Sequence, residues 1–214
     1  MTPYYQDDAV AIYHCDCREL DVWDIAGGVM VTDPPYGMSY VSNHAKGGPS
    51  IPIAADDSTD ARDQVLAVWG DRPALVFGTW RVSRPAGVRQ LLVWDKGESP
   101  GMGDLSMPWG NAHEEIYVFG TGFAGKRRPN VLRRATIAPG AANRPDHPTP
   151  KPIELMHDLI GYCPPLAEVV DPFMGSGTTL RAAKDLGRKA IGIEIDERYC
   201  EIAAKRMSQE VLAL

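Results

Sequence analysis

One stretch of the chain constrains the fold more than any other, because it has the pattern of a strand, a tight turn, a helix and a second strand. Residues 167–171 form a strand-like run, residues 172–177 hold two glycines, a helical pattern starts at Thr178, and residues 189–194 form the next strand-like run. Strand, helix and strand in this order build a parallel sheet. The stretch therefore predicts an α/β fold.

The rest of the chain repeats this alternation. We expect seven strands, at 9–14, 28–32, 74–79, 90–94, 115–119, 167–171 and 189–194. We expect helices at 59–69, 81–89, 153–161, 178–186 and 197–208. Near-continuous apolar runs are typical of strands that are buried on both faces. The pattern predicts one doubly wound, mostly parallel, seven-stranded sheet with helices on both sides.

Length and composition fit a single domain. The chain has 214 residues, 44% of them hydrophobic, which is enough for one core without disulfide or metal staples. No apolar run reaches the roughly 18 residues that a membrane span needs, and residues 1–8 lack the pattern of a signal peptide, so we expect a cytoplasmic protein. A net charge of −6 argues against a protein that coats nucleic acid with its whole surface.

The cysteines do not indicate a metal site. Cys15, Cys17, Cys163 and Cys200 include no C-x-x-C pair, and the cluster His14–Cys17 has no second group of ligands. We expect no metal and free thiols in a reducing compartment.

The glycine-rich turn predicts a cofactor site, although a plain strand-to-helix turn is the alternative. Glycines let the backbone approach a ligand, and Glu194, about 20 residues on, suits the hydroxyls of a ribose. No Gly-Lys-Ser/Thr follows, so the turn is not a phosphate-binding P-loop. Asp171 would repel a pyrophosphate and instead suits an amine, such as the aminoacyl end of S-adenosylmethionine.

A second constellation, Asp33-Pro34-Pro35-Tyr36, follows a buried strand. Prolines often only terminate a strand, because proline cannot donate to a ladder. Here Pro34 and Pro35 also fix the backbone and leave the Pro34 carbonyl free beside the Asp33 carboxylate. Two acceptors next to the ring of Tyr36 suit an exocyclic amino group on a planar heterocycle. The amine donates both hydrogens and directs its lone pair at an electrophile.

Asp-Pro-Pro-Tyr at 33–36, followed far downstream by Asp-Pro-Phe-Met-Gly-Ser-Gly-Thr-Thr at 171–179, resembles the amino-methyltransferases of DNA, and this motif order resembles their beta group. The segments 14–17, 94–96, 101–103, 113–120 and 147–152 resemble further parts of the family, although Pro150 stands where the family usually has Gln. The resemblance implies a circularly permuted methyltransferase sheet, in which the strands before Asp33 and Asp171 are neighbours.

The resemblance also implies site residues. It implies methyl transfer from S-adenosyl-L-methionine to N6 of adenine or N4 of cytosine, which requires a flipped base. In the family, Asp at position 33 is associated with adenine rather than cytosine. Tyr36 would be the aromatic ring on which the flipped base stacks. The catalytic set is Asp33, Pro34, Pro35 and Tyr36. The cofactor set is Asp171, Phe173, Gly175, Gly177, Thr178, Glu194, His147, Thr149 and Lys151, of which Lys151 is expected to reach the methionine carboxylate.

A basic cluster is the expected contact to double-stranded DNA. It consists of Lys126, Arg127, Arg128, Arg133 and Arg134. Asn143 and Arg144 are candidate readers of base edges, and residues 38–58 are a candidate flap. We divide the single domain into a catalytic half (1–95), a loop-rich DNA-recognition region (97–146) and a cofactor-binding half (147–214). The enzyme would be nucleoid-associated, and the resemblance leaves a homodimer and a restriction-modification role open.

Two other functions compete. One is methylation of an amino or amide nitrogen in RNA or protein, although the protein-directed relatives carry Asn-Pro-Pro-Tyr and the opposite motif order. The other is a non-catalytic DNA-binding module, against which the intact Asp33, Tyr36 and Glu194 argue.

Overall fold

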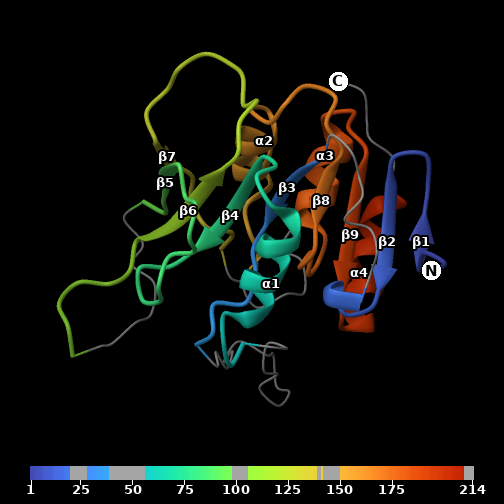
Figure 1. The fold of residues 1–214 in the computed structure, drawn as a ribbon, viewed down its shortest axis with the longest axis horizontal. Helices are drawn as coiled ribbons and strands as arrows, with labels where there is room; N and C mark the ends of the chain where they lie inside the picture. Colours follow the sequence, from blue (N-terminus) through green and yellow to red (C-terminus); the bar gives the residue numbers. More distant parts are fainter. Residues whose placement is uncertain (20–27, 39–55, 98–105, 139–140, 142–149, 210–214) are drawn as a thin grey trace.

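A computed structural model describes residues 1–19, 28–38, 56–97, 106–138, 141 and 150–209. One nine-stranded sheet runs through these segments, in the order β1-β2-β9-β8-β3-β4-β6-β5-β7 (Figure 1). The strands are β1 (Tyr5–Gln6), β2 (Val10–His14), β3 (Val29–Thr32), β4 (Ala74–Gly78), β5 (Gln90–Asp95), β6 (His113–Phe119), β7 (Val131–Arg133), β8 (Val169–Asp171) and β9 (Ala190–Glu194). The helices are α1 (Asp60–Trp69), α2 (Ile153–Ile160), α3 (Thr178–Asp185) and α4 (Glu197–Met207), and there is one short 3-10 turn among the described residues, η1 (Cys17–Glu19).

The sheet is mostly parallel. Strands β2, β9, β8, β3 and β4 pair in parallel, whereas β6 runs antiparallel between β4 and β5. We call the edge where the five parallel strands end the carboxyl edge, and the opposite edge the amino edge. Since β6 is reversed, its first residues lie at the carboxyl edge.

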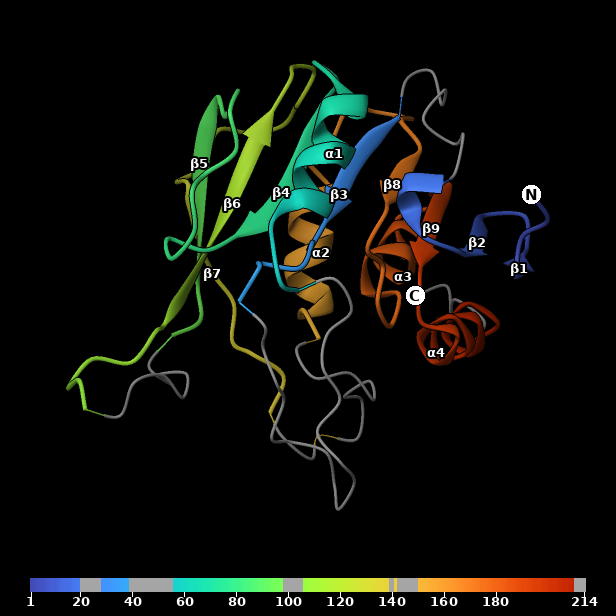
Figure 2. The same ribbon diagram turned by 60° about the horizontal axis from the view of Figure 1, so that its bottom comes forward.

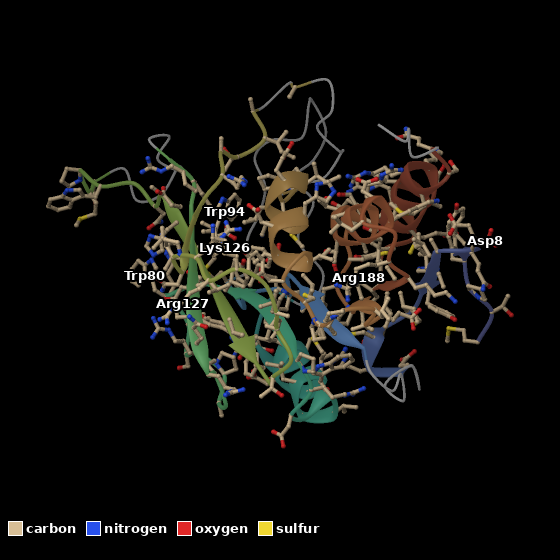
Figure 3. The ribbon with its side chains drawn as sticks, turned by 90° about the horizontal axis from the view of Figure 1, so that it is seen from above. Asp8, Trp80, Trp94, Lys126, Arg127 and Arg188 are labelled. Carbon is tan, nitrogen blue, oxygen red and sulfur yellow. The ribbon has the colours of Figure 1, made fainter. Side chains whose placement is uncertain are left out.

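Alternate side chains of each central strand enter different cores. Val29 and Val31 pack in the core that α2, α3 and α4 cover, while Met30 packs with Val65 and Trp69 of α1 on the other face. Figure 3, seen from above, shows α1 on one side of the sheet and the other three helices on the opposite side. The predicted doubly wound α/β architecture is confirmed.

Two details differ from the sequence-based expectation. The sheet has nine strands rather than seven, because β1 and β7 are edge strands of two and three residues, too short to leave a periodic pattern. The helix expected at 81–89 is wrong: this segment holds Pro85, and Gly87 has a φ of +83° that a helix excludes. The other four helices and all seven expected strands are present.

Part of the region expected to recognise DNA belongs to this scaffold. Both β6 and β7 lie between residues 97 and 146 and add strands to the common sheet.

Within the described segments, no helix is long and apolar enough to cross a membrane.

Candidate active site

The two loops singled out in the sequence meet at the carboxyl edge. Strand β3 pairs in parallel with β8, and the two lie side by side in Figures 1 and 2. The hydroxyl of Thr32 donates a hydrogen bond of 2.7 Å to Asp171, which is 139 positions away in the chain. The predicted neighbourhood of these strands is confirmed.

Asp33, directly after β3, lies in a polar cluster. Its Oδ1 accepts a hydrogen bond of 2.7 Å from the Tyr36 hydroxyl, and its Oδ2 accepts one from the Lys151 ammonium. Pro34 is buried, and no hydrogen bond among the described residues ends on its carbonyl oxygen. The loop thus presents a buried backbone acceptor next to a carboxylate.

Two charged side chains of this cluster were not predicted. Glu114, at the start of β6, accepts from Lys151 at 3.2 Å and from Tyr36 at 3.2 Å. Lys96, directly after β5, lies 2.5 Å from the other oxygen of Glu114. The rings of Phe77 and Trp94 form an apolar wall, with their centroids 4.9 Å and 6.0 Å from the Lys151 nitrogen.

Lys151 was expected on the cofactor side, but the structure gives it partners in the catalytic cluster. Its side chain is only 9% exposed, and its nitrogen contacts the carboxylates of both Asp33 and Glu114. Burial lowers the pKa of Lys151, but these two carboxylates more than offset this effect, so its pKa lies above the usual value. Lys151 is therefore a charged, internally paired ammonium.

Burial and charge act in opposite directions on the two acids of the cluster. For Asp33, burial and the charge of Glu114 raise the pKa, whereas the charge of Lys151 lowers it. The pKa of Asp33 therefore lies above its usual range. For Glu114 the burial effect is outweighed by Lys151 and Lys96, so its pKa lies below the usual range. The pKa of Asp33 is thus shifted upward and that of Glu114 downward, each from its own usual value.

Asp171 points into the protein and holds its own loop. Its carboxylate is buried, accepts from Thr32, and accepts a hydrogen bond of 3.1 Å from the backbone N–H of Phe173. Burial raises the pKa of Asp171 to about 6, although hydrogen bonds from Thr179, Thr32 and Phe173 lower it.

Glu194, at the end of β9, holds the glycine-rich turn from the other side. Its two oxygens accept hydrogen bonds of 2.9 Å from the backbone N–H groups of Gly175 and Asp196. Gly175 has a φ of +49°, in the left-handed region that glycine adopts without a steric penalty. Glu194 therefore sits at the turn, with capacity left on its oxygens for further donors.

Gly177 and Thr178 pack against α4. A Cβ on Gly177 would lie 2.8 Å from that of Ala203, and the Thr178 hydroxyl accepts a hydrogen bond of 3.2 Å from Arg206. Arg206 also donates to the carbonyl of Ser176 at 2.7 Å. These contacts fix where α3 begins.

Comparison with known proteins shows the family and the fold of this chain. Residues 60–205 match the family model of the N6/N4 methyltransferases, described as DNA methylase. This chain belongs to the DNA methylase family. The match covers Glu114, Lys151 and the glycine-rich turn, whereas Asp33 precedes it.

Two curated relatives match part of this chain. The type II methyltransferase M.ScaI of Streptomyces caespitosus is 34% identical over 50% of this chain. The putative methylase YubD of Escherichia coli strain K12 is 38% identical over 46% of this chain. The aligned part of the chain spans only 32% and 43% of the length of these relatives.

Solved methyltransferases share the fold. The crystal structure of an M1.HpyAVI–SAM complex superposes with a TM-score of 0.69 and 24% identity over 94% of this chain and 100% of that one. The PvuII DNA methyltransferase, described as cytosine-N4-specific, superposes with a TM-score of 0.70 and 18% identity over 99% of this chain and 90% of that one.

The basic cluster proposed for DNA is divided between the two edges of the sheet. Since β6 ends at the amino edge, residues 120–128 lie there, and the backbone carbonyl of Lys126 accepts a hydrogen bond of 2.9 Å from the hydroxyl of Tyr162, just beyond α2. This loop lies at the top of Figure 1, and Figure 3 looks onto the same side with Lys126 and Arg127 labelled. Strand β7 then returns the chain, so Arg133 and Arg134 lie towards the carboxyl edge.

Three members of this cluster already have acidic partners. Arg128 and Arg134 both pair with Asp158, at 3.2 Å and 2.6 Å, and Arg133 pairs with Asp95 at 2.8 Å. Arg133 nevertheless remains 75% exposed.

Several predicted residues lie outside the described part of the chain: His147, Thr149, Asn143, Arg144 and most of the flap, 39–55. In the described part, no group of three or more His, Cys, Asp or Glu side chains could hold a metal ion. All four cysteines are free thiols. Burial raises the pKa of Cys17, Cys163 and Cys200 to about 12, so these three are protonated at neutral pH.

Proposed function

We propose that this chain is a DNA methyltransferase that transfers a methyl group from S-adenosyl-L-methionine to the exocyclic amino group of a flipped base, N6 of adenine. The observation that carries the proposal is the hydrogen bond from Thr32 to Asp171, because it joins the strand before the amine acceptors to the strand before the glycine-rich turn. Donor and acceptor of a methyl group held on adjacent strand ends are within reach of each other.

On the amine side, the chain supplies acceptors. The exocyclic nitrogen is a poor nucleophile because its lone pair is delocalised into the ring. Hydrogen bonds to Asp33 and to the Pro34 carbonyl favour a pyramidal nitrogen and stabilise the positive charge that grows on it. The Tyr36 ring stacks on the base, and such stacking typically contributes ~1–3 kcal/mol.

On the cofactor side, the residues present fit S-adenosyl-L-methionine. Glu194 offers acceptors for ribose hydroxyls beside a turn whose backbone it already holds, and Phe173 and Gly175 are the half-buried members of that turn. When bound, the cofactor supplies an electrophilic methyl group on a sulfonium. The carboxylates of Asp171 and Glu194, which have no ion-pair partner among the described residues, make this edge suitable for a cation.

The permuted chain order, the three-part division of the domain and a homodimer stay part of this proposal. So do the partner, double-stranded DNA, and with it an association with the nucleoid. Of the basic cluster, Arg133 is the phosphate contact that the position of β7 supports over Lys126 and Arg127, whereas Arg128 and Arg134 share the carboxylate of Asp158.

The test is incubation with unmethylated duplex DNA and S-adenosylmethionine carrying a labelled methyl group, followed by digestion to nucleosides. We expect labelled N6-methyldeoxyadenosine, and a loss of about 10²–10³ in rate for Asp33→Asn with little change in cofactor affinity. Labelled N4-methyldeoxycytidine would mean that the target base is cytosine instead of adenine. The PvuII enzyme, described as cytosine-N4-specific, has the same fold. Label that enters only RNA or protein would refute a DNA substrate.

A further inference from the structure

Every donor found on the Asp33 carboxylate also reaches Glu114. The Tyr36 hydroxyl lies 2.7 Å from Asp33 and 3.2 Å from Glu114. The Lys151 nitrogen bonds Asp33 and lies 3.2 Å from the same oxygen of Glu114, Oε2. Both oxygens of Asp33 are thus occupied, and both occupants have a second acceptor within hydrogen-bond distance.

Glu114 is equipped to remain an anion in this position. Its side chain is 17% exposed, and its other oxygen, Oε1, is held at 2.5 Å by Lys96. The cluster of Asp33, Glu114, Lys96 and Lys151 contains two carboxylates and two ammonium groups, so it is neutral as a whole. A buried charge is tolerated when it is paired in this way.

An incoming amine competes with Lys151 and Tyr36 for Asp33. Each of these donors already uses one of the about four lone-pair sites of the carboxylate, so an amine that approaches along either of these directions releases the donor that lies there. If the released group had no other acceptor, a buried ammonium or hydroxyl would remain unpaired, which is costly. Glu114 Oε2 removes this cost, because it already lies within hydrogen-bond distance of both the Lys151 nitrogen and the Tyr36 hydroxyl. A donor released by Asp33 can therefore bond Glu114 after only a small movement.

We propose that Glu114 is a positioning residue that takes over Lys151 and the Tyr36 hydroxyl when the target amine arrives at Asp33. The inference rests on the proposed function, since it concerns the same amine site. It assigns Lys151 to the control of Asp33. The proton count does not change in this transfer: Lys151 stays an ammonium, and Tyr36 keeps its phenolic hydrogen.

Glu114→Gln tests this role, and Glu115→Gln is the matched control. Glu115 is the next residue of the same strand, but its partners are Arg84, at 2.5 Å, and Tyr117, at 2.8 Å, and not Asp33. With Gln at 114, Lys151 keeps a single anionic partner and stays on Asp33. We expect kcat to fall about 10- to 100-fold, the range for loss of a hydrogen bond to a charged group, with an unchanged Kd for S-adenosylmethionine. Glu115→Gln should keep wild-type kcat.

The pH profile separates positioning from structural damage. The groups that face Asp33 are Lys151, Glu114 and Tyr36, with Asp171 next along the edge. Activity needs ionised Asp33 and is lost as the pH falls through its pKa. Because the charge of Glu114 raises that pKa, Glu114→Gln should move the acidic limb of kcat/KM to lower pH, a shift that misfolding does not produce.

The outcomes are distinct. Wild-type protein that methylates no DNA would refute the proposed function, and this inference with it. Active wild type with an unimpaired Glu114→Gln variant would refute the inference alone. A variant that loses cofactor binding together with turnover would also refute it, as would a slowed variant with an unshifted acidic limb, because Glu114 would then be structural.

Discussion

Asp33 and Asp171 are both buried carboxylates at one sheet edge, but they differ in their partners. Asp33 faces a lysine and a second acid, while Asp171 accepts only from neutral hydroxyl and amide groups. A buried carboxylate without a positive partner is held in its charged form less well. The pKa of Asp171, about 6, records this difference.

The raised pKa of Asp171 predicts how stability depends on pH. Because the folded pKa lies above the unfolded value of 3.8, the contribution of Asp171 is fully present below pH 4 and is lost as the pH rises through about 6. Relative to Asp171→Asn, the wild type should therefore lose about 2–3 kcal/mol of unfolding free energy between pH 4 and pH 7. Urea unfolding of both proteins across this range is the measurement, and parallel curves would contradict the assignment.

At the scale of the element, helix α3 has a left-handed glycine near each end. Gly177 has a φ of +76° and touches Ala203 of α4, while Gly187 has a φ of +67° with open space around it. Alanine at either position adopts an unfavourable backbone conformation, but only at Gly177 does it also overlap a neighbouring helix.

Gly187→Ala should therefore cost about 1–2 kcal/mol of unfolding free energy from the backbone alone. Gly177→Ala should cost about 1–3 kcal/mol more, because the overlap with α4 must be relieved. Thermal or urea unfolding of the two variants gives the difference directly. Equal losses would mean that α4 moves aside freely and that Gly177 is needed only for its φ.

The basic cluster has residues at both edges of the sheet, and the salt dependence of DNA affinity should show which edge contacts phosphates. Each phosphate contact contributes about −0.9 to the slope of log affinity against log salt concentration. Arg133→Gln should flatten the slope by about 0.9 units, whereas the double variant Lys126→Gln, Arg127→Gln should leave it unchanged. Fluorescence anisotropy at several salt concentrations provides the slopes. A flattened slope for the double variant would place the DNA path across the amino edge.

Periodicity predicted most elements but not the edges of the sheet. Continuous apolar runs identified seven strands, and the motif at 171–179 placed the glycine-rich turn beside Asp33. Strand β7 has three residues and one buried side chain, so it leaves no pattern to read. The helix expected at 81–89 shows that helix-forming residues do not outweigh Pro85 and a left-handed Gly87.

The charged part of the site could be predicted only in outline. Asp33 and Tyr36 follow from a local motif, but Lys96, Glu114 and Lys151 come from three separate segments. Each is a charged residue near one end of a strand or before a helix, a pattern that is typical of solvated surface positions. The order of β4, β6 and β5 in the sheet brings Lys96 and Glu114 towards Asp33, and Lys151 reaches it from the segment directly before α2.

At the scale of the whole molecule, the proposed reaction requires a base to leave the duplex. Extrusion costs a few kcal/mol, and less when the base is mispaired. DNA with a mismatch or an abasic site opposite the target should therefore bind more tightly than the paired duplex, and Tyr36→Ala should narrow the difference. Equal affinities in a titration with labelled DNA would argue for a single-stranded substrate.

The reversed direction of β6 has one further consequence. Two glutamates follow each other on this strand, and β6 pairs Glu114 with Trp94 and Glu115 with Val93. Successive side chains of a strand point to opposite faces, so a shift of β6 by one residue would bring Glu115 to the position of Glu114 and turn Glu114 to the opposite face. A single inserted amino acid in the segment before His113 could thus replace one glutamate by the other beside Lys151 while leaving both in the sequence. When relatives are aligned, a gap misplaced by one position here would identify the wrong acid.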